Sequence, residues 1–222
     1  MGPKDRRGVV AFIYAMSDMH GDMEAFDRAL SVVDLDDPAN RLVLCGDYMA
    51  PPDTDTAMVR LIMGIQGEHP GQVIALMGNH ELAYLEDHRA VASADDPVVA
   101  WLRGLPYYWE TDTQIFVHAG VDEEAQDLWR YGSEDAYFCE KFPWSTGAFL
   151  KDVIAGHVGT ATIADDPWFH DVYWDGQSHY YLDGSVHVSH RIPVLKYDTV
   201  ARRYTCFRFG ADGSVEEHEP ML

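Results

Sequence analysis

The chain has 222 residues, of which 47% are hydrophobic and 12% aromatic, so it can bury a sizeable core and is not an intrinsically disordered chain. Its 16 lysine and arginine residues against 37 aspartate and glutamate residues give a net charge of −21, which would repel nucleic acid and anionic membranes over most of the surface. We therefore expect a single domain over residues 1–222, with no nucleic-acid or membrane partner.

The first half of the chain alternates apolar, β-rich runs with amphipathic segments. Strands are expected over 9–16, 41–45 and 73–77, with helices over 23–33 and 56–65 between them. This β-α-β-α-β order predicts an α/β fold in which helices cover a sheet, and polar sites gather at the strand ends of such sheets.

The second half is dominated by strands. Two short helices are expected first, around 81–85 and over 97–102, where Pro97 suits a first helical turn. Strands are then expected over 107–110, 114–118, 153–155, 172–174, 179–182, 194–197 and 204–209. The segment 122–146 has no clear pattern, and no linker composition marks a domain boundary.

Three widely spaced cysteines, Cys45, Cys139 and Cys206, form no C-x-x-C pair. They predict neither a disulfide framework nor a zinc knuckle, and a reducing cytoplasm is the simplest location. The arginine pair and short apolar run within 6–16 superficially resemble a secretion signal, but no small-residue cleavage site follows them. We therefore expect a cytoplasmic protein.

Each predicted strand of the first half runs directly into a polar cluster. Asp18 and His20, two residues apart, project to the same side of an extended segment and can bind one ion together. Asp47 ends the second strand, where one carboxylate can bridge two cations, although an aspartate that caps the next segment is the simpler interpretation. Asn79 and His80 follow the third strand, in the more specific string Gly-Asn-His-Glu.

Two later strand-like segments end in a similar way, at His118 and His157. Either histidine alone would more often be an ordinary core or turn residue than a ligand. The repetition changes this balance, because five strand-like segments each end in an Asp, Asn or His beside glycine. Glycine beside a ligand lets the backbone and a metal ion approach closely. The sequence therefore predicts a metal site where these strand ends meet.

The ordered motifs D-x-H-G, G-D, G-N-H-E, H-A-G and G-H resemble those of the calcineurin-like metallophosphoesterase superfamily. Within it they are most similar to the phosphoprotein phosphatase branch and its bacterial serine/threonine phosphatase and diadenosine tetraphosphatase relatives. The resemblance implies a four-layer α/β/β/α sandwich, with two mixed β-sheets flanked by helices. It also implies a set of metal ligands: Asp18 and His20 for the first metal, Asp47 as the bridging carboxylate, and Asn79, His118 and His157 for the second.

The implied cofactors are two divalent transition-metal ions. Carboxylate, imidazole and amide ligands without a thiolate suit Mn²⁺, with Fe or Zn²⁺ as alternatives. The resemblance implies that a hydroxide bridging the two ions attacks phosphorus in line. It also implies that His80 protonates the leaving-group oxygen, a step typically worth about 10²–10⁴-fold.

The second motif departs from the family pattern. Where that branch has G-D-x-x-D-R-G, this chain has Ala50 for the Asp that orients the catalytic histidine and Pro51 for the Arg that grips phosphate. Asp53 is the candidate replacement partner of His80, although two prolines stiffen its loop. Arg130 is the candidate phosphate-binding residue, with a solvated surface arginine as the alternative.

The leading functional prediction is hydrolysis of a phosphate monoester, with phosphoserine or phosphothreonine in proteins as the substrate most suggested by the resemblance. Cleavage of a dinucleoside polyphosphate or another nucleotide phosphoester is the first alternative. A metal-binding scaffold of weak activity is the second, because Ala50 and Pro51 replace two catalytic groups. The expected partners are a phosphorylated protein or a small phosphoester substrate, and the sequence indicates no oligomeric state. Four further histidines match no motif of the site: His170, His179, His187 and His190.

Overall fold

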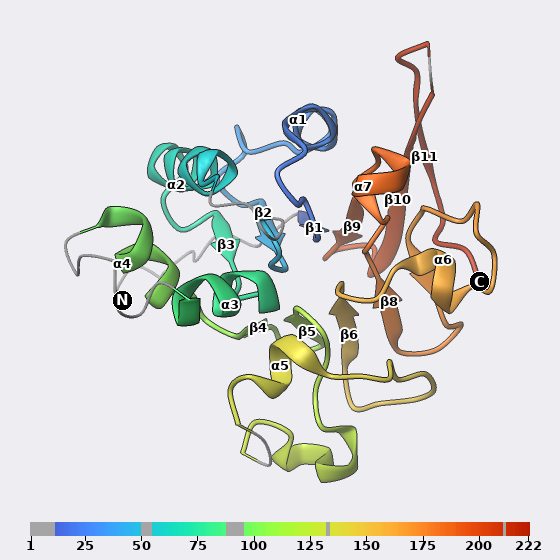
Figure 1. Ribbon diagram of the computed structural model, residues 1–222. Coiled ribbons are helices and arrows are strands. Elements are labelled where there is room, and N and C mark those ends of the chain that lie inside the picture. The colour runs from blue at the N-terminus through green and yellow to red at the C-terminus, as the bar shows by residue number, and fades with distance from the viewer. Residues whose placement is uncertain (1–11, 50–54, 88–95, 132–133, 211) are drawn as a thin grey trace, which may run out of the picture.

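A computed structural model describes residues 12–49, 55–87, 96–131, 134–210 and 212–222, and two mixed β-sheets form its centre (Figure 1). The first sheet has the strand order β11-β10-β9-β1-β2-β3. Its strands are β1 (Phe12–Met16), β2 (Arg41–Leu44), β3 (Val73–Ala75), β9 (Leu195–Asp198), β10 (Arg203–Phe209) and β11 (Val215–His218). Strands β1, β2 and β3 are parallel, while β9, β10 and β11 continue the sheet with antiparallel pairings.

The second sheet has the strand order β4-β5-β6-β8-β7. Its strands are β4 (Tyr108–Glu110), β5 (Gln114–Val117), β6 (Asp152–Ala155), β7 (Tyr173–Trp174) and β8 (His179–Tyr181). The central strands β5, β6 and β8 are parallel, and the edge strands β4 and β7 are antiparallel to their neighbours. Each sheet therefore has a parallel trio whose carboxyl ends lie at one edge, where side chains from successive loops can meet.

Helices join and cover these sheets (Figure 1). They are α1 (Met23–Leu30), α2 (Ala57–Glu68), α3 (Asn79–Asp87), α4 (Pro97–Arg103), the 3₁₀ helix η1 (Glu123–Leu128), α5 (Tyr137–Glu140), α6 (Thr160–Ile163) and α7 (Val186–Ser189). Helix α1 begins where the Asp22 carboxylate accepts a hydrogen bond from the backbone N–H of Ala25, a capping interaction that satisfies a free donor of the first turn. No helix in the described ranges is both long and apolar enough to cross a membrane.

The layers follow from the two-residue period of the strands. In β1, Tyr14 and Met16 join the core that packs against α1, α2 and α4, whereas Ile13 and Ala15 join the core between the two sheets. A third core covers the outer face of the second sheet and includes residues of α5 and its surroundings. The expected four-layer α/β/β/α sandwich is therefore confirmed, with short helices and loops as its fourth layer.

The described strands agree closely with the predicted ones apart from β11, whereas the short helices η1, α5, α6 and α7 were not predicted. Strand β11 was not predicted because its sequence, Val-Glu-Glu-His, shows no apolar alternation. The strand is largely exposed, so it has no apolar face to bury. The segment 122–146 contains η1 and α5, which are too short to show a helical period. The predicted helix over 23–33 ends at Leu30, where the backbone N–H of Ser31 closes the last turn.

Candidate metal centre

The six predicted metal ligands come from five different segments and meet at the carboxyl ends of the parallel strands. Asp18 and His20 follow β1, Asp47 follows β2 and Asn79 begins α3. His118 follows β5 and His157 follows β6, so the second sheet contributes as well. A pocket of about 520 Å³ is lined by Asp18, His20, Asp47, Asn79, His80, His157, Asp183 and His187. His118 is fully buried and contacts two of these residues, Asp47 and Asn79.

Three of these side chains converge on one point. The Asn79 Oδ1 atom lies 2.8 Å from His118 Nε2 and 2.9 Å from His157 Nδ1. His118 Nε2 is also 3.4 Å from Asp47 Oδ2. The other ring nitrogen of His118, Nδ1, donates to the Cys45 carbonyl over 2.8 Å, which leaves Nε2 with a lone pair. Such a backbone partner typically fixes a metal-binding histidine in its ligand form.

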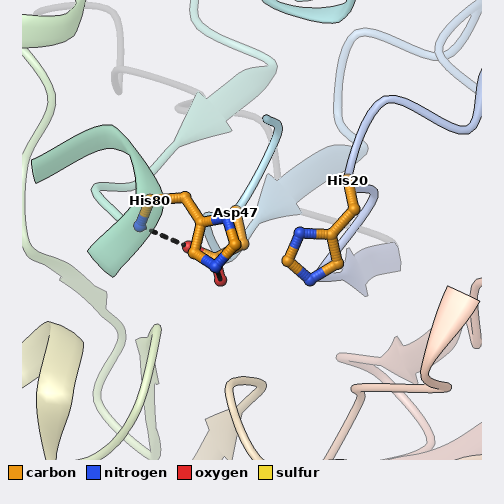
Figure 2. A group of neighbouring side chains, drawn as sticks. All are labelled: His20, Asp47 and His80. Atoms are coloured by element: carbon orange, nitrogen blue, oxygen red, sulfur yellow. Dashed lines mark hydrogen bonds and ion pairs between the residues drawn. The ribbon is translucent and has the colours of Figure 1, made fainter. Parts of the chain in front are cut away.

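A second group of donor atoms lies beside the first. His20 Nε2 is 3.7 Å from Asp18 Oδ1, and Figure 2 shows His20, Asp47 and His80 converging from three segments of the chain. Donor atoms of His20, Asp47 and His80 lie within 4.8 Å of one another, as do those of Asp18, Asp47 and His118. Asp47 belongs to both groups, which is the position that a bridging carboxylate requires.

The backbone at this edge is held in a conformation that ordinary residues rarely adopt. Four of the predicted ligands have positive φ angles, with values of 56° at Asp18, 42° at His20, 56° at Asp47 and 67° at His157. Each such residue costs on the order of 1–3 kcal/mol, and strained residues of this kind cluster at functional sites. The rest of the fold must therefore compensate this loss of stability in order to hold these side chains toward one another.

Glycine is required where the loops approach each other. At Gly46, with a φ of 96°, an added Cβ would lie 2.7 Å from the Cα of Gly78 and 2.8 Å from His118 Nδ1. At Gly156, an added Cβ would overlap the Asp18 carboxylate and the Ser17 side chain. These contacts explain why the predicted ligands are flanked by glycine.

Glu81 organises the loop that carries Asp47. Its two carboxylate oxygens accept hydrogen bonds from the backbone N–H groups of Asp47 (2.8 Å), Tyr48 (2.9 Å), Met49 (3.3 Å) and Gly78 (3.1 Å). The side chain is fully buried. Glu81 thus satisfies four backbone donors that would otherwise be buried without partners.

The buried acids of the centre are difficult to ionise together. Burial raises the pKa of Asp18 to about 7, with the charge of Glu81 adding to the effect. Burial, followed by the charges of Asp18 and Glu81, raises the pKa of Asp47 well above its ordinary value. Burial also lowers the pKa of His118 well below its ordinary range and lowers that of His157. This environment suits divalent cations. A bound cation would stabilise the ionised form of the carboxyls, and the neutral imidazoles can bind it without first losing a proton.

His80 is oriented by a backbone carbonyl. Its Nδ1 atom donates to the Met49 carbonyl oxygen over 2.8 Å, and its Nε2 atom is 3.7 Å from Asp47 Oδ2. The same carbonyl lies 3.2 Å from Nδ1 of His20, whose ring centre is 4.7 Å from that of His80. Burial, then the neighbouring His20, lowers the pKa of His80. Among the described residues, the Met49 carbonyl is therefore the group that orients the His80 ring.

Of the other two predicted catalytic residues, only Arg130 lies within the described structure, and it is paired elsewhere. Asp53 lies outside the described residues, as do Ala50 and Pro51. Arg130 forms an ion pair with Glu110, donating from Nε over 2.9 Å, and its guanidinium lies over the Trp129 ring at 4.6 Å. Among the described residues, those that line the pocket do not include Arg130.

Two lining residues were not assigned from the sequence. Asp183 follows β8, and burial, then the charge of Asp18, raises its pKa to about 7. Asp183 stands beside Gly184 shortly after a strand, which is the same pattern that marks the predicted ligands. His187 lies on α7, and no spacing in the sequence distinguished it from the other unassigned histidines.

Comparison with known proteins agrees with this geometry. A family model described as calcineurin-like phosphoesterase matches residues 13–212. The chain is 27% identical over 125 residues to the symmetrical bis(5'-nucleosyl)-tetraphosphatase of Nitrosococcus oceani, and 29% identical over 123 residues to that of Chromobacterium violaceum. These matches cover 49% of this chain but only 44% and 43% of the relatives, so the matched region spans less than half of their length.

Solved structures show the same fold at low identity. A cold-active protein tyrosine phosphatase superposes with a TM-score of 0.62 at 16% identity, covering 94% of this chain and 78% of that one. A serine/threonine phosphatase from Saccharomyces cerevisiae with similarity to human phosphatase PP5 also gives a TM-score of 0.62, at 12% identity, covering 98% and 82%. At these identities the likeness concerns the fold alone.

Proposed function

This chain belongs to the calcineurin-like phosphoesterase family and is a metal-dependent phosphoester hydrolase, and we propose that its substrate is a dinucleoside polyphosphate. The observation that carries this substrate class is the sequence match, at 27–29% identity, to symmetrical bis(5'-nucleosyl)-tetraphosphatases. The protein phosphatases resemble the chain only in fold. The proposal therefore places the dinucleoside polyphosphate ahead of the phosphorylated protein that the motifs first suggested.

The proposed metal centre uses the six predicted ligands. Asp18 and His20 would hold one divalent ion, Asn79, His118 and His157 the other, and Asp47 would contact both. The convergence of Asn79 Oδ1 with two imidazole nitrogens at 2.8 and 2.9 Å supports this arrangement. When bound, the ions would activate a water molecule and stabilise the phosphoryl oxygens; oxygen and imidazole ligands suit Mn²⁺, with Fe or Zn²⁺ as alternatives.

The chain's own residues prepare the rest of the reaction. The bond from His80 Nδ1 to the Met49 carbonyl keeps the ring turned so that Nε2 lies on the side of Asp47. There the doubly protonated ring would give its Nε2 proton to the leaving oxygen. Among the described residues that line the pocket, none is a lysine or arginine. A polyphosphate would therefore rely on the divalent ions for charge compensation.

Three buried cysteines without disulfide bonds, Cys45, Cys139 and Cys206, support the proposal of a reducing cytoplasmic location. The charge of −21 supports the expectation of a small phosphoester partner and no nucleic-acid partner.

The test compares substrates with metal-stripped protein to which Mn²⁺ is restored. Bis(5'-adenosyl) tetraphosphate should be converted to two nucleoside diphosphates, with a kcat/KM at least about tenfold above those for a phosphoserine peptide and an aryl phosphate. Faster turnover of the phosphoserine peptide would replace the substrate proposal by a protein phosphatase. Full metal content with no turnover of any of the three would favour a scaffold.

A further inference from the structure

A second group of potential metal ligands lies outside the catalytic pocket, where the two sheets meet at their edges. Cys206 is on β10 and His218 is its direct partner on β11, both in the first sheet. Asp171 lies in the loop before β7, the edge strand of the second sheet. One donor atom from each of these three residues lies within 4.8 Å of the other two.

Two of the three spacings are close to those of tetrahedral coordination. His218 Nε2 is 3.6 Å from Cys206 Sγ and 3.1 Å from Asp171 Oδ2. Ligands on a tetrahedral zinc ion, with bonds of ~2.3 Å to sulfur and ~2.1 Å to nitrogen or oxygen, lie roughly 3.4–3.6 Å apart. Cys206 Sγ also lies 3.4 Å from His218 Nδ1, so the imidazole ring would have to turn before Nε2 and Sγ could face one ion.

The tautomer of His218 makes its Nε2 atom an acceptor. Nδ1 lies 2.9 Å from the carbonyl oxygen of Glu219, and a carbonyl oxygen accepts hydrogen bonds, so Nδ1 carries a proton. In the neutral ring, Nε2 then presents a lone pair to the Asp171 carboxylate, which is also an acceptor. Two acceptors 3.1 Å apart need a cation between them, which is either a second proton on the ring or a metal ion.

The carboxylate is also held in place. Asp171 Oδ1 accepts a hydrogen bond of 2.8 Å from the backbone N–H of Val172, which leaves Oδ2 directed at His218. Arg208 lies 3.7 Å from the same Oδ2 atom, but its side chain is 46% exposed and also pairs with Glu216 at 3.6 Å. The guanidinium therefore has a second carboxylate partner if a cation occupies the site.

We propose that Asp171, Cys206 and His218 form a structural site for one zinc ion, distinct from the catalytic centre. Thiolate, imidazole and carboxylate together select a borderline-soft cation such as Zn²⁺, and a fourth position remains for water. The ion would connect the β10–β11 hairpin of the first sheet to the β7 edge of the second. This inference does not depend on the substrate proposed above.

The burial of Cys206 excludes a nucleophilic role for this triad. The residue has no exposed surface, and burial, then the charge of Asp171, raises the pKa of its thiol. A nucleophilic cysteine needs an accessible thiolate. A metal ion instead displaces the thiol proton as it binds, while His218 and Asp171, each with a side chain 15% exposed, provide its entry route.

Cobalt(II) is the probe, because a cobalt–thiolate bond gives an intense near-ultraviolet absorption band and the proposed catalytic ligands include no thiolate. Wild-type protein loaded with Co²⁺ should show the band. Cys206→Ser should lose it, whereas Cys139→Ser, which alters another buried thiol, should keep it. Zinc-loaded wild type should hold about one more metal equivalent per chain than Cys206→Ser.

His218→Asn provides a second test in case Cys206→Ser misfolds. It leaves every thiol in place and changes a ring that is partly exposed. It should weaken Zn²⁺ binding at this site by at least about tenfold while keeping a cooperative thermal transition. A wild type without the thiolate band, and with the same zinc content as Cys206→Ser, would overturn the proposal and leave a protonated, hydrogen-bonded His218.

Discussion

Two buried groups of histidine and carboxylate side chains in this molecule differ in how their charges are balanced. In the first, the candidate metal centre, burial raises the pKa of Asp18 and Asp183 to about 7 and lowers that of His118 and His157. In the second, which we call the His179 cluster and which contains His179, Asp175 and Glu123, the shifts have the opposite sign.

The His179 cluster is complete within the protein. His179 Nδ1 lies 2.9 Å from Asp175 Oδ2, and His179 Nε2 lies 3.1 Å from Glu123 Oε1. Although burial opposes it, hydrogen bonds and charges from Glu123 and Asp175 raise the pKa of His179. Burial acts to raise the pKa of Asp175 and of Glu123, but hydrogen bonds, including those from His179, outweigh it and lower both pKa values. The imidazolium offsets one of the two carboxylates and Lys141, with its Nζ 4.0 Å from Glu123 Oε1, offsets the other, so the cluster needs no external ion.

The same residue types therefore have different consequences in the two groups. The candidate metal centre keeps its histidines neutral and its acids reluctant to ionise, so its charge balance improves when cations bind. The His179 cluster supplies its own cation and serves the fold. In this molecule the direction of the pKa shifts, more than residue identity, distinguishes the candidate metal centre from the structural cluster.

Matched carboxylate-to-amide changes test this difference most directly. Asp47→Asn should lower metal-dependent phosphoester hydrolysis by at least about 10³-fold. Loss of a ligand that contacts both ions should reduce activity more than loss of a residue that only contacts a ligand, which typically reduces it about 10–100-fold. Asp175→Asn, the matched control in the His179 cluster, should retain activity within about threefold and lose thermal stability. Assays with restored Mn²⁺, together with metal analysis, measure both. Equal losses in the two variants would remove the distinction.

The second prediction concerns the acid at the pocket. His80→Asn should lower kcat by about 10²-fold, the lower end of the range for general acid catalysis, because a backbone carbonyl orients His80 and adds no negative charge. The bound metal content should stay unchanged, since the proposal does not count His80 among the ligands. A substrate with a good leaving group, such as an aryl phosphate, should show a smaller loss because its departing oxygen needs less protonation. A loss equal for good and poor leaving groups would contradict the role of His80 as an acid.

The sequence predicted the α/β layers and the converging strand ends because both follow from local patterns. Period-2 alternation places Ile13 and Tyr14 on opposite faces, and the parallel trios bring the motif ends to one edge. The orientation of His80 was not predictable, because a backbone carbonyl leaves no signature in side-chain identity. Likewise, nothing in the spacing of His179 and His187 indicated that one completes a buried cluster and the other lines the pocket.

The third prediction breaks the His179 cluster itself. His179→Asn should destabilise the fold by about 3 kcal/mol, because it leaves the carboxylates of Asp175 and Glu123 buried without their cation. The folded-state pKa of His179 is raised above its ordinary 6.5, so its stabilisation is fully present below that value and is lost as pH rises through the raised pKa. The cost of the substitution, measured by denaturant unfolding, should therefore be larger near pH ~6 than near pH ~9. A cost that grows toward high pH would contradict the assigned charges.

The smallest predicted effect is the pH dependence of metal affinity. In the metal-free protein the pKa of Asp18 is about 7, raised from its ordinary 3.8 by burial, so the carboxyl is mostly protonated below that pH. A metal ion binds the carboxylate and must displace this proton, which weakens binding by up to about tenfold for each pH unit below 7 and for each proton released. The lowered pKa of His118 and His157 keeps both rings neutral near pH 7, so they add little to the slope there.

Mn²⁺ titrations followed by calorimetry between pH ~6 and ~8 should show affinity rising and then levelling, with proton release below pH 7. Asp175→Asn should reproduce the same curve, because the His179 cluster binds no ion, and an affinity independent of pH would show that the buried acids are already ionised without metal.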